Sequence, residues 1–258
     1  MTNAQISNKQ VIINDLLINY YFFLSDKKNA KILIFLHGWG VDSQLWFKLI
    51  PELINKNYSM YFLDLPGFGQ TQLPNTTYDI NDYKKIIYEF IKKLELKNIN
   101  LIGHSFGGSI GIKLASENPS YLSKLILVNA AGIRNSSTLK SIKSTLAKII
   151  SPIFSPSFMQ PIRIKFYQLI GSEYLNYPAM SKIFTRVVSE NLMPLLLKIK
   201  KPTLIITGDK DKVTPIAHAQ EMNQEIKKST LVILSAGHFS FLDQPDEFNK
   251  ALINFINS

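Results

Sequence analysis

Cysteine is absent from this chain of 258 residues. Its absence excludes disulfide bonds, thiolate metal sites, iron–sulfur clusters and a cysteine nucleophile. Long apolar runs are absent too: no stretch reaches the roughly 18 apolar residues of a membrane-spanning helix, so no stable membrane insertion is expected. The polar N-terminus, Met1 to Gln10, lacks the apolar segment of a signal peptide. We therefore expect a cytoplasmic protein.

Acidic side chains are few, with 19 Asp and Glu against 29 Lys and Arg and a net charge of +10. Residues 134–200 contain ten basic residues but only two acidic ones, Glu173 and Glu190. About a quarter of the chain therefore carries most of the excess positive charge. No nucleic-acid-binding motif accompanies this charge, and no nucleic-acid partner is expected. Two hypotheses explain the positive charge. It reflects a lysine-rich composition without function, or it attracts an anionic substrate or surface.

Short apolar runs alternate with helical patterns along most of the chain. The hydrophobic content of 46% is that of a globular protein. Strands are expected at 16–24, 31–37, 58–64, 98–104, 122–129, 203–207 and 230–234, and helices at 43–56, 79–96, 106–118, from 216 onward and at 245–257. This order predicts an α/β fold with βαβ units around a mostly parallel sheet.

The alternation stops at Gly132. Residues 133–197 contain five prolines, short helical patterns and no clear strand. We predict a core made of residues 1–132 and 198–258, with 133–197 as an inserted helical segment.

Residues 103–107 have the form G-x-S-x-G and lie between an apolar strand and a helix. This is the pattern of a nucleophile elbow, in which a strained turn projects the hydroxyl of Ser105 from the sheet edge. Gly103 and Gly107 allow the strand and helix backbones to approach closely. The backbone N–H of Phe106, at the start of the helix, is placed to bind a developing oxyanion.

A serine nucleophile needs a general base, and the chain has only four histidines. His37 ends a strand, and the side chain of His104 should point away from the neighbouring hydroxyl. His218 lies in a predicted helix and is expected to be solvated. His238 follows a late strand and a glycine, at the sheet edge where catalytic groups gather. We predict that His238 is the base.

The third member of such a triad is a carboxylate that orients the imidazole. Asp209 and Asp211 both follow the strand at 203–207, and Asp243 lies close to the predicted base in sequence. Asn129, at the end of the preceding strand, occupies another common position for this acid but carries no charge. We prefer Asp211, which gives the chain order Ser, Asp, His that is typical of this arrangement.

These motifs together resemble the α/β-hydrolase family along essentially the whole chain. The matching pieces are His37 to Gly40 (HGWG), Asp64 to Gly69 (DLPGFG), the elbow, Gly208 to Pro215 (GDKDKVTP) and Ala236 to Phe248 (AGHFSFLDQPDEF). The resemblance implies an eight-stranded, mostly parallel sheet flanked by helices, with residues 133–197 as a cap over the active site. It also implies that the backbone N–H of Trp39 is the second oxyanion donor beside Phe106, and that no metal or organic cofactor is needed.

Residues that differ from the motifs of particular subfamilies exclude some of the reactions known in this family. Haloalkane dehalogenases and epoxide hydrolases carry Asp at the elbow, so Ser105 argues against both. The HGWG segment does not match the HGGPG of proline iminopeptidases. Carbon–carbon bond hydrolases of ring-cleavage products remain an alternative, although they often carry Asn where this chain has His104. The arginine that they use in the cap could be Arg134, Arg163 or Arg186.

We therefore predict a serine hydrolase that cleaves carboxylic esters of small to medium size, or lactones, through an acyl-enzyme intermediate. The expected partner is a small-molecule ester or lactone, bound in a pocket that includes Gly38, His104 and Phe239. A ligand receptor on the hydrolase scaffold is a second alternative, and the oligomeric state is left open. Apolar residues from Leu139 to Ile150 form a stripe flanked by lysines. They predict a cap helix over the pocket or, alternatively, peripheral contact with an anionic lipid surface.

Overall fold

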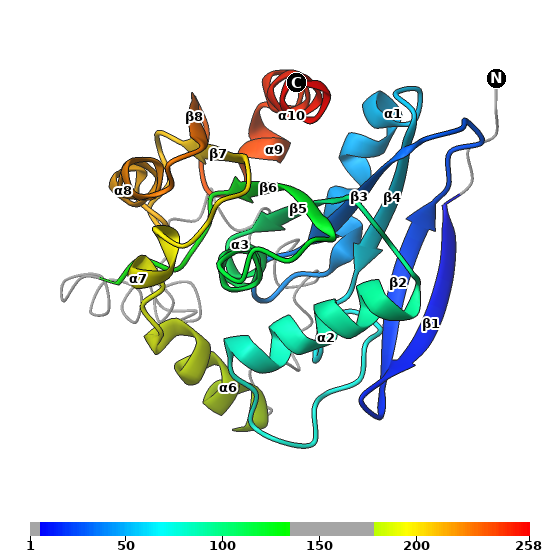
Figure 1. The fold of residues 1–258 in the computed structure, drawn as a ribbon. Coiled ribbons are helices and arrows are strands. Elements are labelled where there is room, and N and C mark those ends of the chain that lie inside the picture. The colour runs from blue at the N-terminus through cyan, green and yellow to red at the C-terminus, as the bar shows by residue number, and fades with distance from the viewer. Residues whose placement is uncertain (1–5, 135–177) are drawn as a thin grey trace, which may run out of the picture.

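The structure is a computed structural model that describes residues 6–134 and 178–258. An eight-stranded sheet forms its centre (Figure 1). The strands are β1 (Ser7–Ile13), β2 (Leu16–Phe23), β3 (Lys31–Leu36), β4 (Tyr58–Leu63), β5 (Ile99–His104), β6 (Leu122–Val128), β7 (Thr203–Gly208) and β8 (Ser229–Leu234).

The strand order across the sheet is β1-β2-β4-β3-β5-β6-β7-β8. β2 runs antiparallel to both β1 and β4, and every other neighbouring pair is parallel. The predicted eight-stranded, mostly parallel sheet is therefore confirmed. Because β3, β5, β6, β7 and β8 run in the same direction, the loops that follow them meet along one edge of the sheet.

Helices cover both faces of this sheet (Figure 1). One face carries α2 (Ile80–Lys93), α3 (Phe106–Ala115), α6 (Pro178–Ser189), α7 (Met193–Leu196) and α8 (Ile216–Glu225). The other carries the 3-10 helix η1 (Ser43–Leu49), α1 (Ile50–Leu53), α9 (Ser240–Asp243) and α10 (Pro245–Asn257). Two hydrophobic cores, one on each face, therefore hold the sheet between them.

The central strands show why their sequence is apolar throughout. In β3, Ile34 and Leu36 point into the core under α2 and α3, whereas Leu33 and Phe35 point into the core under α10. All four side chains are fully buried. Successive side chains of a strand point to opposite faces, so a strand covered on both sides needs an apolar residue at every position.

Two local features differ from the sequence expectations. The segment predicted as one helix at 43–56 is the 3-10 helix η1 followed by the single turn α1. Pro51 lies at the start of α1, where its missing N–H costs no hydrogen bond. Strand β1 was not predicted, because its first four residues are polar and exposed at the sheet edge.

Within the predicted cap, residues 178–197 contain α6 and α7. The predicted helix from Leu139 to Ile150 lies outside the described residues, and so does Arg163. The extent of the inserted segment therefore stays a prediction. Across residues 6–134 and 178–258, we find no helix that combines the length and apolar character needed to cross a membrane.

Candidate active site

Ser105 lies on the turn between β5 and α3, as the sequence predicts. Its backbone has φ 50° and ψ −109°, a conformation that non-glycine residues rarely adopt. Such a conformation costs about 1–3 kcal/mol and persists only where the surroundings enforce it. Here the Ser105 N–H donates to the Val128 carbonyl at 3.0 Å, and the Ser105 carbonyl accepts from Ala131 N–H at 3.0 Å. The turn is thus tied to the end of β6.

The flanking glycines are required by close backbone contacts. A Cβ on Gly103 would lie 2.4 Å from the Gly107 carbonyl oxygen, and a Cβ on Gly107 would lie 2.5 Å from the Leu36 carbonyl oxygen. Neither contact is sterically allowed, because real Cβ atoms essentially never approach below 3.0 Å. Strand β5, helix α3 and the end of β3 therefore approach one another at the turn that carries Ser105.

His238 and Asp211 are paired directly. His238 Nδ1 lies 2.8 Å from Asp211 Oδ2, with the carboxylate fully buried and the imidazole 15% exposed. An ionised carboxylate only accepts hydrogen bonds, so His238 Nδ1 carries the proton and donates it to Asp211. In the neutral ring, Nε2 then has a free lone pair, which is the tautomer that a general base requires.

The carboxylate of Asp211 is held by several further donors. Its Oδ1 accepts from Val213 N–H at 2.7 Å and from Thr214 N–H at 3.0 Å, and the Thr214 hydroxyl lies 2.6 Å from Oδ2. Burial alone would raise the pKa of Asp211. The hydrogen bond and charge of His238, with the hydrogen bonds of Thr214, outweigh burial and lower that pKa well below its usual range. Asp211 is therefore ionised across the physiological range.

The two competing carboxylates have other tasks. Asp209 accepts from the Ala236 N–H at 3.1 Å, and Asp243 accepts from the Gly237 N–H at 2.7 Å. Both bonds fix the backbone of the loop that leads into His238. The structure therefore places Asp211 against the imidazole, while the other two acids shape the loop that carries it.

Three further histidines are buried and neutral. The Nε2–H of His104 donates to the His238 carbonyl at 2.9 Å, and burial lowers the pKa of His104 to about 3. Burial also lowers the pKa of His37 and of His218. The expectation that His218 is solvated is wrong: only 4% of the residue is exposed, because the first turns of α8 pack against the sheet.

The candidate oxyanion donors Trp39 and Phe106 lie next to each other. Their ring centroids are 5.5 Å apart. Phe106 is the first residue of α3, a position whose N–H has no acceptor within the helix. A Cβ on Gly38 would lie 3.2 Å from the Ser105 Cβ, which brings the loop after β3 directly against the predicted nucleophile.

His37 holds this loop through both of its ring nitrogens. Nε2 accepts from the Leu65 N–H at 2.9 Å, so the proton is on Nδ1, which donates to the Gly38 carbonyl at 2.7 Å. In a trans peptide the carbonyl and the next N–H point in opposite directions. By fixing the Gly38 carbonyl, His37 therefore fixes the direction of the Trp39 N–H. The sequence placed His37 at the end of a strand and at the start of the HGWG segment, without giving its side chain a role.

Comparison with known proteins identifies the fold family. A sequence profile for the alpha/beta hydrolase fold matches residues 31–169 and 184–245. The chain belongs to the α/β-hydrolase family.

Individual relatives extend this likeness over nearly the whole chain. This α/β-hydrolase is 28% identical over 255 residues to the AB hydrolase superfamily protein YisY of Bacillus subtilis strain 168, covering 92% of this chain and 95% of that protein. It is 27% identical over 266 residues to the monoacylglycerol lipase ABHD6 of Homo sapiens, covering 92% and 79%. The solved esterase EaEST from Exiguobacterium antarcticum matches with a TM-score of 0.77 and 26% identity, covering 94% and 96%.

The predicted pocket residues surround the elbow of this α/β-hydrolase. His104 is 1% exposed, and its ring lies 5.0 Å from that of Phe239 and 4.8 Å from that of His238. Phe239 is half-buried. His104 thus lies beneath the turn and supports the loop that carries His238. The assignment of Gly38, His104 and Phe239 to the substrate pocket stays a prediction.

Helix α6 covers the predicted oxyanion loop, which carries Trp39, with its apolar face. The ring of Phe184 lies 5.1 Å from that of Trp39. A Cβ on Gly67 would lie 2.8 Å from the Met180 sulfur, so the segment after β4 also packs closely against α6. This face of α6 therefore lies over the same loop that presents the Trp39 N–H.

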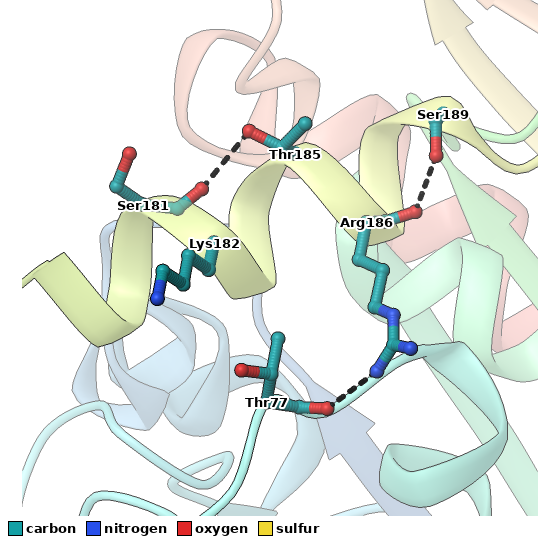
Figure 2. A pocket seen from close by; sticks show the side chains of 6 residues that line it. All are labelled: Thr77, Ser181, Lys182, Thr185, Arg186 and Ser189. Carbon is teal, nitrogen blue, oxygen red and sulfur yellow. Dashed lines mark hydrogen bonds between the residues drawn. The ribbon is translucent and has the colours of Figure 1, made fainter.

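The opposite face of α6 carries a hollow of about 370 Å³ (Figure 2). Its lining residues are Thr77, Ser181, Lys182, Thr185, Arg186 and Ser189. Arg186, one of the three predicted cap arginines, donates to the Thr77 carbonyl at 2.8 Å. Arg134, another of them, donates to the carbonyls of Val188 at 2.6 Å and Ile133 at 3.0 Å. Both guanidinium groups thus contact backbone oxygens.

Proposed function

We propose that this α/β-hydrolase is a serine hydrolase that cleaves carboxylic esters of small to medium size, or lactones, through an acyl-enzyme intermediate. The observation that carries the proposal is the buried pair of Asp211 and His238, bonded at 2.8 Å. It lies at the same sheet edge as Ser105, which is held in a strained turn. A strained serine and an imidazole protonated on Nδ1, both at one sheet edge, support the activation of a hydroxyl nucleophile.

In the proposed reaction, His238 Nε2 accepts the proton from Ser105 as the hydroxyl attacks the ester carbonyl. The ionised Asp211 stabilises the imidazolium that forms. The N–H groups of Trp39 and Phe106 bind the oxyanion of the tetrahedral intermediate. His238 then protonates the leaving alcohol. A water molecule repeats the sequence on the acyl-enzyme, which frees the acid and restores Ser105.

Two further observations support ester chemistry. The relatives include a monoacylglycerol lipase and an esterase, each more than 25% identical to this chain. Both names refer to carboxylic ester cleavage. Aromatic side chains gather around the predicted oxyanion loop, with the rings of Phe68, Phe106 and Phe184 all within 5.5 Å of Trp39. Such surroundings favour an apolar acyl or alcohol group.

The direct test is a panel of p-nitrophenyl esters of graded chain length, with lactones, assayed on the parent and on Ser105→Ala. We expect turnover of at least one short or medium ester by the parent. Ser105→Ala should lose this turnover by at least about a thousandfold, while its circular dichroism and melting temperature match those of the parent. A variant as active as the parent would contradict the serine mechanism.

The same panel separates the alternatives that the sequence leaves open. A carbon–carbon bond hydrolase would act on ring-cleavage dienones faster than on any ester. A ligand receptor on this scaffold would bind a small molecule without measurable turnover of either substrate class. Including one dienone beside the esters therefore distinguishes all three.

A further inference from the structure

Asn129 follows the last residue of β6 and is almost completely buried, with 1% exposed. Its φ is 44°, a left-handed conformation that asparagine tolerates better than most residues. In the sequence, Asn129 is notable only as an uncharged residue at the end of a strand, a common position for the acid of the triad. In the structure its side chain is among the most thoroughly hydrogen-bonded at the candidate site.

The amide of Asn129 contacts both loops of the candidate acid–base pair. Its Nδ2 donates to Asp211 Oδ2 at 2.7 Å and to the Gly237 carbonyl at 3.2 Å. Its Oδ1 accepts from the Ser240 hydroxyl at 2.5 Å. The donors thus face two acceptors and the acceptor faces a hydroxyl. The reverse orientation would set Oδ1 against the carboxylate of Asp211, so only this orientation satisfies the contacts.

Together with the main chain from His238 to Ser240, these bonds close a ring. His238 donates to Asp211, Asp211 accepts from Asn129, and Asn129 accepts from Ser240, which lies two residues after His238. The Thr214 hydroxyl adds a brace, because it lies 3.0 Å from the Asn129 carbonyl oxygen and 2.6 Å from Asp211 Oδ2. The ring therefore joins the end of β6 to the loops after β7 and β8.

We propose that Asn129 is a positioning residue for the hydrolase reaction, and the proposal rests on the proposed triad. Through Nδ2 it holds Asp211 Oδ2 where His238 Nδ1–H can reach it. Through Gly237 and Ser240 it keeps the loop that carries His238 in register with the acid. The neutral amide suits this task because a second carboxylate at 129 would repel Asp211 at hydrogen-bond distance.

The test variant is Asn129→Gly, because glycine tolerates the positive φ and only the side chain is removed. The matched control is Asn118→Gly. Asn118 also has a positive φ of 50°, and its amide also joins two chain segments, donating to the Lys198 carbonyl and accepting from the Lys200 N–H, both at 2.8 Å. It lies after α3, away from the loops of the triad.

Two readouts are needed on each protein. The first is steady-state kinetics with the best ester of the panel. For Asn129→Gly we expect kcat to fall by roughly ten- to hundredfold, as for a lost hydrogen bond to a charged group, with KM little changed. The second is the low-field proton NMR signal of the His238 Nδ1–H bonded to Asp211, which should shift or disappear. The control should retain both the parental kcat and the signal.

Each outcome decides the proposal. A folded Asn129→Gly with parental kcat and an unchanged low-field signal overturns it. So does an equal loss of kcat in Asn118→Gly, because the loss would then be generic. If the parent turns over no ester, the proposed function fails, yet the low-field signal still reports whether Asn129 positions the His238–Asp211 bond.

A second pair of variants tests the proposal if Asn129→Gly does not fold. Ser240→Ala removes only the hydroxyl that orients the Asn129 amide, and Ser240→Thr keeps a hydroxyl at that position. We expect kcat to fall in Ser240→Ala and to recover in Ser240→Thr, with the low-field signal following kcat. Equal activity and equal signals in the two variants would overturn the proposal.

Discussion

Two polar regions of this hydrolase differ in how their side chains bond. Around Asp211, the hydrogen bonds cross between loops that are far apart in sequence, and Asn129 and Asp211 are separated by 82 positions. In the hollow on α6, Thr185 donates to the Ser181 carbonyl and Ser189 donates to the Arg186 carbonyl, both within the helix, and Arg186 reaches a distant segment, at the Thr77 carbonyl (Figure 2). Polar composition alone is therefore a poor guide to a functional site. Convergence of distant segments is the better one.

The largest effect is expected from a change of Asp211, the carboxylate of the buried region. In Asp211→Asn, the new amide can donate to His238 Nδ1, so the ring proton moves to Nε2 and the base loses its lone pair. We expect kcat for the best ester to fall by about 10⁴-fold. The control is Asp209→Asn, which should keep activity close to the parent, because Asn can still accept from the Ala236 N–H. Equal losses in both would show that Asp211 has no special role.

The second prediction concerns the loop that presents the Trp39 N–H. His37→Phe leaves the Leu65 N–H and the Gly38 carbonyl without their partner, which costs about 1–3 kcal/mol for each buried group. We expect a lower free energy of unfolding, measured by urea titration, and a kcat reduced more than KM is changed. His37→Gln supplies one donor and one acceptor and should recover part of both. Parental kcat in His37→Phe would mean that this loop takes no part in the reaction.

A third prediction uses pH. The pKa of a buried neutral histidine is lowered on folding, so below its unfolded value, about 6.5, the unfolded chain binds more protons and stability falls. His37, His104 and His218 all contribute in this direction. The pKa of Asp211 is lowered as well, so its contribution is complete above about pH 4 and is lost below it.

We therefore expect the free energy of unfolding to fall in two stages on acidification, first below about pH 6.5 and again below about pH 4. The measurement is urea unfolding across this range on the parent and on Asp211→Asn. The variant should keep the first stage and show a smaller second one. A parental second stage in the variant would assign that loss to other carboxylates.

The smallest effect should come from the hollow on α6. Arg186→Ala removes one exposed guanidinium and its bond to the Thr77 carbonyl. Surface changes of this kind usually alter stability by less than about 0.5 kcal/mol. We expect kcat and KM for neutral esters to stay at parental values. A large loss of kcat would place the outer face of α6 in the catalytic cycle and remove the contrast between the two regions.

Much of the fold could be predicted because it depends on local pattern. The run from Lys31 to Leu36 is apolar at every position that the two cores cover, and Asp79 caps α2 through hydrogen bonds to Asn81 and Asp82 within the same turn. Strand β1 escaped prediction because it is held by pairing with β2 and its first four residues are polar and exposed.

Less of the candidate site than of the fold could be predicted from the sequence. Ser105 and its glycines carry a local motif, and the structure places them on the expected turn. The choice between Asp209 and Asp211 could only be argued by preference, since both follow the same strand. The contacts of Asp211 with His238 and of Asn129 with Asp211 and Ser240 are tertiary contacts that no local pattern encodes. A polar residue at the end of a buried parallel strand is the one signal that could have drawn attention to Asn129.

The backbone of Ser105 also limits which nucleophile this turn can carry. At φ 50°, a side chain branched at Cβ meets the flanking backbone. Threonine therefore adds steric strain to a turn that is already strained, whereas cysteine has the same unbranched shape as serine. A cysteine at position 105 would therefore fit this turn without further strain, whereas a threonine would require the turn itself to be rebuilt.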